Sequence, residues 1–351
     1  MKDGYYISAY LHIDEIAHLY HFHIRHDQNI SLWRKNGESI SLIHVWELER
    51  ITGLKKCNRS FANIDQVKKM ISQLLESEGL AFDDIEQIFG TPGLDTCSDY
   101  HSGDEYPSIS YHSISHMFSA LLANTDVFYK EKIIAVAVDG GPDSVVDEDV
   151  YGRNYYCGAY VDKGEVHLFP ISSPGFFWTY TRKLTGMEEG SLMALASASK
   201  SELLNYDDEL IEVYGLSDLK KAYQYILQKY DEIMAFSKDD IGKKVKLWDE
   251  RFSDIENRYS MLAKLVQKIS LRIMEENIEK IVHDSGFELT DSYLAISGGY
   301  GLNCPTNSYL MNKYKFKGFL SIPGISDAGI SVGMGLYYFY KKMKKIEFRF
   351  S

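Results

Sequence analysis

The sequence predicts an α/β protein made of two related halves. Two apolar segments have the pattern of buried strands, and each runs directly into a glycine-containing turn. These segments are 133–138, followed by Asp139-Gly140-Gly141, and 293–296, followed by Ser297-Gly298-Gly299. A continuous apolar run suits a strand that is covered on both faces. Because a helical segment follows each turn, we expect a ligand cleft where the carboxyl ends of these strands meet.

The amino-terminal part is expected to be rich in strands. Residues 5–34 show alternation through Tyr20, Phe22 and Ile24, followed by a turn at residues 27–29. A short strand is expected at 40–44. Segment 63–78 fits a helix, because Asn63 suits a helix cap, apolar residues recur at helical spacing, and Gly79 follows as a stop signal.

The rest of the chain alternates between strand and helix signals. Segments 155–160 and 166–170 flank Asp162-Lys163-Gly164 and are predicted to form a hairpin. Apolar residues at helical spacing indicate helix across 216–283, and 327–345 is predicted to be a helix with small residues on one face.

Length, charge and cysteine usage limit the classes of protein to consider. The 351 residues allow about two domains or one fold of two lobes. A net charge of −12 argues against broad nucleic-acid or anionic membrane surfaces, and no apolar run approaches the roughly 20 residues of a membrane span. No secretory signal is visible, and the four cysteines form no CxxC pair. We therefore expect a cytoplasmic protein that is not membrane-bound.

Two histidines and an aspartate are the first candidates for metal chemistry. His112 and His116 are four residues apart, so on a helix they share one face and suit a single metal ion. In a chain with 11 histidines such a pair also arises by chance. Asp139 follows a buried strand and could bind a metal or simply form a turn. Asp143 and Asp147 are further acids in the same loop, and of these two only Asp143 is a weak candidate for a functional role.

A second group of histidines, His18, His21, His23 and His26, is denser. It lies on the alternating segment, which would direct neighbouring side chains to opposite faces of a strand, and no carboxylate is expected beside it. We therefore interpret this group as surface and sheet packing.

Two further segments are candidates for ligand binding. The glycines at 298–301, with Asn303 and Asn307 after them, would let a backbone approach a phosphate closely, although a tight connection between a strand and a helix explains them as well. Asp327 is expected at the first position of a helix, where an acid is usually a capping residue.

In their order along the chain, several of these segments match one family. The matching stretches are Glu49–Lys55, Tyr111–Ala120, Val138-Asp139-Gly140, Glu189–Ala196, Gly298–Asn307 and Asp327-Ala328-Gly329. Together they resemble the amino-terminal, Kae1-like domain of the O-carbamoyltransferases of the NodU/CmcH/TobZ type. The resemblance extends from about residue 5 to 340, nearly the whole chain.

The resemblance implies an actin-like ATPase fold (ASKHA, Kae1-like) of two RNase-H-like lobes with a central cleft. On this basis we expect a first lobe at 1–130 and a second at 131–351, with helix 327–345 closing the cleft. It also implies a divalent metal held by His112, His116, Asp139 and Asp327, with Fe²⁺ expected first and Zn²⁺ or Mg²⁺ as alternatives.

The resemblance assigns further roles in binding and catalysis. His12 and Asp14 match the family's catalytic loop, displaced by one residue, and His12 is the candidate general base. Lys55 is a candidate anion contact, and Gly298, Gly299, Asn303 and Asn307 would bind the adenylate. The expected donor is carbamoyl adenylate, or ATP with carbamoyl phosphate from which it is made.

The implied function is the transfer half of an O-carbamoyltransferase, with a small-molecule, saccharide or nucleoside hydroxyl as acceptor. Members of this family carry a second, YrdC-like domain that makes the donor, and this chain ends where that domain would begin. We expect a separate YrdC-like subunit or a shortened sequence, with a different activated donor as a third option. The alternatives are a threonylcarbamoyl-type or nucleobase-directed transferase acting on nucleic acid, which the charge disfavours, and a non-catalytic Kae1-like scaffold.

Overall fold

The computed structural model describes residues 1–206 and 210–349, and its first sheet has four strands. These are β1 (Gly4–Tyr10), β2 (Asn29–Asn36), β3 (Ser39–Glu47) and β4 (Ile85–Phe89). Their order is β3-β2-β1-β4, where β1 pairs with β2 and β2 with β3 in antiparallel fashion, and β1 pairs with β4 in parallel.

The second sheet has five strands. These are β5 (Lys132–Ala137), β6 (Cys157–Asp162), β7 (Glu165–Pro170), β10 (Ser292–Ser297) and β11 (Gly318–Leu320). Their order is β11-β10-β5-β6-β7. The pairs β5–β6 and β6–β7 are antiparallel, whereas β5–β10 and β10–β11 are parallel.

The two sheets share one topology. In each, the first strand along the chain lies between its antiparallel successor and a later parallel strand, and the third strand lies beyond the second. This repeated RNase-H-like arrangement confirms the predicted α/β class with two related halves.

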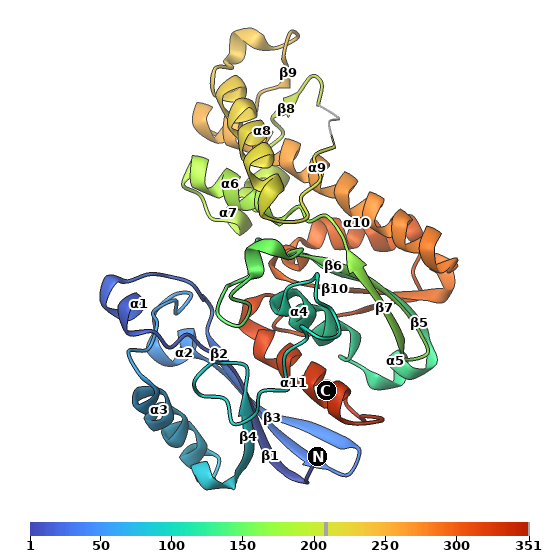
Figure 1. Cartoon of the computed structure of the whole chain (residues 1–351). Coiled ribbons are helices and arrows are strands. Elements are labelled where there is room, and N and C mark those ends of the chain that lie inside the picture. Colours follow the sequence, from blue (N-terminus) through green and yellow to red (C-terminus); the bar gives the residue numbers. More distant parts are fainter. Residues whose placement is uncertain (207–209, 350–351) are drawn as a thin grey trace.

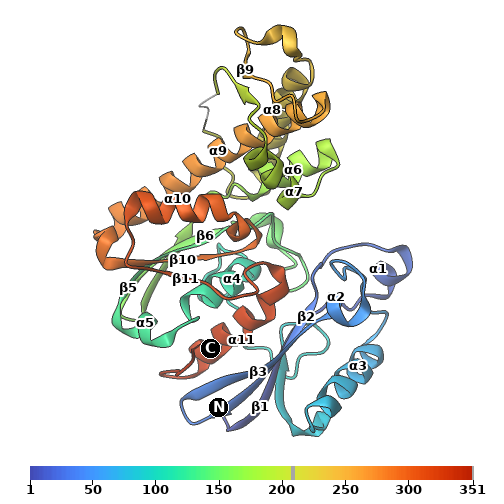
Figure 2. The same cartoon turned by 180° about the vertical axis from the view of Figure 1, so that it is seen from behind.

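Helices separate and cover the two sheets, so the molecule has alternating helical and sheet layers (Figures 1 and 2). Helix α3 (Ile64–Ser77) covers the outer face of the first sheet through Val67, Ile71 and Leu75. Helices α4 (Tyr111–Leu121) and α11 (Ile330–Lys342) lie between the sheets, and α9 (Asp254–Ser285) and α10 (Cys304–Tyr314) cover the far face of the second sheet.

The remaining helices and strands lie outside the two sheets and the helices that cover them. Short helices α1 (Glu15–Tyr20) and α2 (Leu48–Thr52) lie on the first lobe, and α5 (Thr125–Lys130) packs on β5 and β6. A helical part projects from the second lobe at the top of Figure 1. It contains the outer part of α9 together with α6 (Gly175–Thr185), α7 (Glu189–Ala198), α8 (Leu216–Met234) and the two-stranded sheet of β8 (Glu202–Leu203) and β9 (Val245–Leu247).

Most of the predicted elements are confirmed, and the strand expected through Tyr20, Phe22 and Ile24 is wrong. Residues 15–20 form helix α1, and His21 ends it in the left-handed conformation with φ 57°. The alternation did not reflect a buried face, because Tyr20 and Phe22 are 70% and 56% exposed. The helical region predicted across 216–283 contains the two helices α8 and α9, with β9 between them.

The predicted division at residues 130 and 131 stays a prediction, and its second lobe includes residues 207–209 and 350–351, which lie outside the described part. Helices α4 and α5 precede this point in the chain but pack on the second sheet. Helix α11 comes last and packs on β1 and β2 of the first sheet. The two lobes are therefore joined by helices that cross between them. No helix in residues 1–206 and 210–349 combines the length and apolar character needed to cross a membrane.

Candidate metal centre

Helix α4 places two imidazoles side by side between the sheets. Ser110 caps the helix by accepting a hydrogen bond from the Ser113 amide, 3.2 Å away. His112 and His116 follow one turn apart, with ring centroids 4.9 Å from each other, and both are buried at 4% and 2% exposure. The helical pairing predicted from their spacing is confirmed.

Two carboxylates from distant parts of the chain complete the cluster. Asp139 follows β5, and Asp327 begins the one-turn helix η6 (Asp327–Gly329) that precedes α11. His112 Nε2 lies 3.4 Å from Asp139 Oδ2, and His116 Nε2 lies 3.2 Å from Asp327 Oδ1. One candidate ligand atom from each of the four residues lies within 4.8 Å of the others.

The glycine-rich turn after β10 holds Asp139 in place. Gly298 has φ +90°, and a Cβ there would lie 2.2 Å from the Val138 carbonyl oxygen. The Gly299 amide donates a hydrogen bond of 2.9 Å to Asp139 Oδ1. Only glycine fits such a close approach of two strand ends at this backbone angle. Gly298 and Gly299 therefore shape the candidate metal site, and their predicted role in binding a cofactor stays a prediction.

Residues of the first lobe contact Asp327. The Tyr10 hydroxyl donates to Asp327 Oδ2 over 3.1 Å, and Asn29 Nδ2 donates to the Asp327 carbonyl oxygen over 2.6 Å. His26 Nδ1 lies 3.7 Å from Asp327 Oδ2, and this negative charge, opposed by burial, helps to raise the pKa of His26 to about 9. His26 is 53% exposed, which agrees with the predicted surface position. The expectation that no carboxylate lies beside the histidine group is wrong for His26, whose Nδ1 also lies 2.7 Å from Asp27 Oδ2.

The second ring nitrogen of His112, Nδ1, faces a further carboxylate outside the cluster of four. This nitrogen lies 2.9 Å from Asp143 Oδ2, and Asp143 Oδ1 accepts a hydrogen bond of 2.9 Å from Arg25 Nε. Burial opposes the charge of Asp143, but Arg25 and His112 hold its pKa below the usual range. Arg25 was missed by sequence reasoning, because nothing in the local pattern at residue 25 indicates a buried partner at residue 143.

The electrostatics of the cluster favour a cation. Burial lowers the pKa of His112, yet the charge of Asp327 and the other carboxylates outweighs it and holds that pKa well above the usual range. Burial likewise opposes the charge of Asp327, but His112 and His26 hold its pKa well below the ordinary value. His112 Nε2 is fully buried and has no hydrogen-bond partner. Two imidazoles and two carboxylates with such an unpartnered nitrogen fit a divalent transition metal.

His12 and Asp14, predicted to be catalytic, make no hydrogen bond or ion pair with the four ligand candidates in the described part of the chain. His12 is buried, and its Nδ1 lies 2.6 Å from Ser60 Oγ. Burial, with the charge of Arg25, lowers the pKa of His12. Asp14 is exposed and caps α1 by accepting a hydrogen bond of 2.6 Å from the Ala17 amide.

The other residues predicted to bind the donor, Lys55, Asn303 and Asn307, lie in different parts of the structure. Lys55 is exposed in the loop after α2, and its neighbour Lys56 lies 3.7 Å from Glu188 at the start of α7. Asn303 caps α10 and donates to Gln267 Oε1 over 2.8 Å. Asn307 donates to the Gly301 carbonyl over 2.8 Å, and its Oδ1 is buried without a partner.

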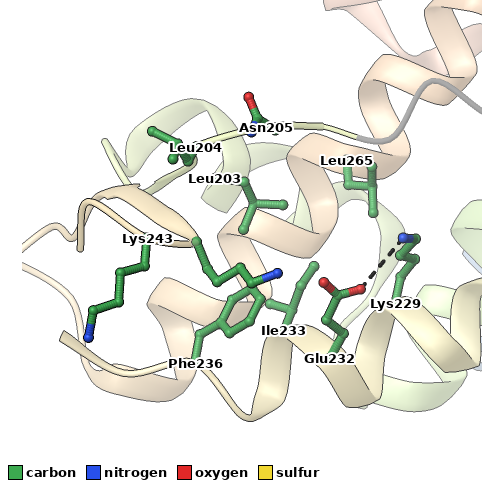
Figure 3. A pocket seen from close by; sticks show the side chains of 10 residues that line it. Leu203, Leu204, Asn205, Lys229, Glu232, Ile233, Phe236, Lys243 and Leu265 are labelled. Carbon is green, nitrogen blue, oxygen red and sulfur yellow. Dashed lines mark ion pairs between the residues drawn. The ribbon is translucent and has the colours of Figure 1, made fainter. Parts of the chain in front are cut away.

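Two cavities lie in the helical part of the second lobe. One, of about 540 Å³, lies between α7, α9 and the start of α10, and its walls include Met193, Gln267 and Pro305. The other, of about 200 Å³, lies between α8 and α9 with Leu203 and Phe236 in its wall (Figure 3). None of the predicted site residues lines this second cavity.

Comparisons with known proteins find few similarities in sequence. No family model matches the chain. The uncharacterized protein MJ1051 of Methanocaldococcus jannaschii is 22% identical over 234 residues. The match covers 64% of this chain and 40% of that relative, so the chain spans less than half of the relative's length.

Three solved structures are similar in backbone structure to most of this chain. The activator of the 2-hydroxyisocaproyl-CoA dehydratase from Clostridium difficile, with bound ADPNP, has a TM-score of 0.46 and 12% identity, covering 98% of this chain and 100% of its own. Component A of the (R)-2-hydroxyglutaryl-CoA dehydratase from Acidaminococcus fermentans has a TM-score of 0.47 and 10% identity, covering 96% and 98%. Full-length HypF in its phosphate- and nucleotide-bound form has a TM-score of 0.47 and 13% identity, covering 98% and 57%.

Proposed function

We propose that this chain is a metal-dependent carbamoyltransferase of the NodU/CmcH/TobZ type, moving a carbamoyl group from carbamoyl adenylate to an acceptor hydroxyl. The observation that carries the proposal is the convergence of the buried His112, His116 and Asp327 with the partly buried Asp139, with His112 Nε2 unpartnered. Two carboxylates held against two imidazoles in a buried site are costly without a cation, so their convergence favours a bound metal.

His112, His116, Asp139 and Asp327 would hold Fe²⁺, with Zn²⁺ or Mg²⁺ as alternatives. When bound, the metal supplies Lewis-acid polarisation of a carbonyl or phosphoryl oxygen. The chain's own residues orient this site: Gly299 holds Asp139 through its amide, and Tyr10 and Asn29 hold Asp327 from the first lobe.

The nucleotide part of the donor would lie along the turn from Gly298 to Asn307. The buried Oδ1 of Asn307 lacks a partner and is available to a ligand donor group. The cavity of about 540 Å³ adjoins this turn at Pro305, and Lys264 and Lys268 in its wall provide positive charge. Asn303 would act indirectly, because its side chain already caps α10 and contacts Gln267.

In the transfer itself the acceptor oxygen forms a bond to the carbamoyl carbon, and the bond from that carbon to the phosphate oxygen breaks. AMP leaves with the bonding electrons, and the hydroxyl proton passes to a base. His12 suits this base, since burial lowers its pKa and keeps the imidazole neutral near pH 7. Asp14 would contribute its charge only, because its carboxylate caps α1. Lys55, which is exposed in the loop after α2, would contact an anionic group of the donor.

We propose a small-molecule, saccharide or nucleoside acceptor, a separate YrdC-like subunit as donor source, and a cytoplasmic location. The net charge of −12 supports a small acceptor over nucleic acid, because it disfavours a large polyanionic partner.

The first experiment measures bound metal in chain purified without oxygen. We expect about one iron or zinc per chain, and loss of that metal in His112→Ala and His116→Ala. His167→Ala is the matched control, because His167 of β7 stacks on Tyr160 of β6 and, within the described part of the chain, has no hydrogen bond or ion pair with the cluster. A chain that binds no metal when it is supplied would contradict the proposal and favour the scaffold.

The second experiment measures AMP release with ATP, carbamoyl phosphate, a YrdC-like protein and candidate acceptors. Acceptor-dependent AMP release that is lost in His116→Ala supports the proposal. Tight, salt-sensitive binding to tRNA or DNA, with no release on small acceptors, would replace it with the nucleic-acid-directed alternative.

A further inference from the structure

Two buried side chains, Asp143 and then Arg25, follow one another in contact behind the candidate metal ligand His112. The His112 ring contacts Asp143 Oδ2 through Nδ1 at 2.9 Å, and Arg25 Nε donates to Asp143 Oδ1 over 2.9 Å. The side chains of His112, Asp143 and Arg25 are 4%, 5% and 1% exposed. A charged pair buried this completely is costly unless both partners are held by further contacts.

Arg25 is held on the first lobe by contacts in three directions. Its Nη1 donates to the Leu11 carbonyl over 2.7 Å and to the Gly90 carbonyl over 3.1 Å. Its guanidinium carbon lies 4.4 Å from the centroid of the Tyr10 ring. Since Leu11 and Gly90 follow β1 and β4, the guanidinium is fixed to the ends of two neighbouring strands of the first sheet.

Asp143 comes from the second lobe and meets Arg25 from there. It lies in the loop after β5, four residues beyond Asp139, and its Oδ1 also accepts the Val145 amide over 2.9 Å. Its two oxygens are therefore divided between donors: Oδ1 receives Arg25 and Val145, and Oδ2 faces His112.

This division selects one form of the His112 ring. A carboxylate paired with arginine only accepts hydrogen bonds, so the ring nitrogen facing Asp143 carries the proton. In the neutral ring the lone pair is then on Nε2, which lies 3.4 Å from Asp139 Oδ2 and 3.6 Å from Asp327 Oδ1. That nitrogen is the one that the proposed metal site requires as a ligand.

We infer that Asp143 and Arg25 are positioning residues that hold His112 in the metal-binding tautomer, with Arg25 held against the first sheet, whose strands supply none of the four ligand side chains. This inference rests on the proposed function, and it adds that tight metal binding requires Asp143 and Arg25. Mutating a residue that hydrogen-bonds a metal ligand typically weakens metal binding by about 10- to 100-fold.

The test compares metal affinities of the full chain and three variants, using chelator competition with Zn²⁺ and the visible spectrum of bound Co²⁺. In Asp143→Asn the amide oxygen would face Arg25 and Val145, which leaves the amide NH₂ toward His112 and imposes the wrong tautomer. We expect about 10- to 100-fold weaker binding and an altered Co²⁺ spectrum. Arg25→Lys keeps the charge but loses the shared anchoring, so an intermediate loss is expected.

Asp147→Asn is the matched control. Asp147 is also a buried carboxylate of this loop, pairs with Arg153 over 3.1 Å and with His101 over 2.6 Å, and accepts a hydrogen bond from the Tyr111 amide at the start of α4. Asp147 does not contact the His112 ring. The metal affinity of Asp147→Asn should therefore stay within about threefold of that of the unsubstituted chain, which is a much smaller loss than we expect for Asp143→Asn.

The outcomes separate this inference from the proposed function. If the unsubstituted chain binds metal and Asp143→Asn binds it equally well, or if Asp147→Asn loses as much affinity, the inference is wrong while the metal site stands. If the unsubstituted chain binds neither metal, the proposed function and the inference both fall. Weaker binding by Asp143→Asn in a chain that carries out no carbamoyl transfer would support the inference and contradict the function.

Discussion

Asp95 shows how burial controls a single ionisable group in the first lobe. It accepts hydrogen bonds from the Thr91 amide over 2.9 Å and from the Tyr100 hydroxyl over 2.7 Å. Burial raises its pKa from 3.8 to about 6, and these bonds and the charge of Arg25 only partly oppose the rise. The folded protein therefore holds this proton to a higher pH than the unfolded chain does.

This raised pKa predicts a loss of stability with increasing pH. Stability from the protonated form is fully present below about pH 4 and is lost as the pH rises to about 6, because only the unfolded chain ionises freely in that window. The difference between 3.8 and about 6 corresponds to about 3 kcal/mol at most.

Urea unfolding of the wild type and Asp95→Asn between pH 4 and 7 measures this effect. The free energy of unfolding of Asp95→Asn, taken relative to the wild type, should increase as the pH rises and level off above about pH 6. A difference that does not change with pH would show that Asp95 has an ordinary pKa in the folded protein.

Helices α4 and α11 cross at a contact that permits no side chain. A Cβ on Gly333 of α11 would lie 1.9 Å from the Ser115 carbonyl oxygen of α4 and 3.1 Å from Ser119 Cβ. His116 follows Ser115 directly, and Asp327 lies shortly before α11. The spacing of these two helices therefore also sets the distance between two candidate ligands, and it explains the glycine at position 333 among the small residues predicted on one face of 327–345.

Gly333→Ala should separate the two helices. We expect a loss of about 1–3 kcal/mol in unfolding free energy, as for other overpacked sites, together with weaker metal binding. The control is Gly190→Ala in α7, where a Cβ would meet nothing within 4 Å, and that change should be neutral or stabilising by up to about 1 kcal/mol. Equal thermal stability of the two variants would contradict this view of the crossing.

The layered arrangement makes the proposed metal a link between distant parts of the chain. Its four candidate ligands come from α4, the end of β5 and the start of η6, and first-lobe residues hold Asp327 and Asp143 from outside. The unfolded chain has no such preformed site, so bound metal should stabilise the folded state.

At a free metal concentration 100 times the dissociation constant, the stabilisation should be about 2.7 kcal/mol. For a chain of this length that corresponds to a rise of roughly 3–5 °C in melting temperature. Differential scanning calorimetry with metal and after chelation measures the rise, and His116→Ala should abolish it. An unchanged melting temperature in a chain shown to bind metal would indicate that the unfolded chain binds it as well.

Local patterns in the sequence predicted the features that depend on neighbours along the chain. The spacing of His112 and His116 predicted a shared helical face, and the apolar run ending at Asp139 predicted a buried strand with an acid at its end. These predictions succeeded because helical and strand periodicities are set by the backbone over a few residues. The same reasoning failed at Tyr20 and Phe22, where alternating aromatic residues are exposed on α1 and the loop after it.

By itself, the sequence determined the α/β class, the two related halves and the individual ligand candidates. Only the tertiary structure decided that Arg25, Tyr10 and Asn29 of the first lobe support this cluster, and that Asp14 and Asn303 are helix caps. The physical reason is distance along the chain. Contacts such as Arg25–Asp143 join residues more than 100 positions apart, and the crossing of helices and the meeting of two sheets, rather than any local periodicity, bring them together.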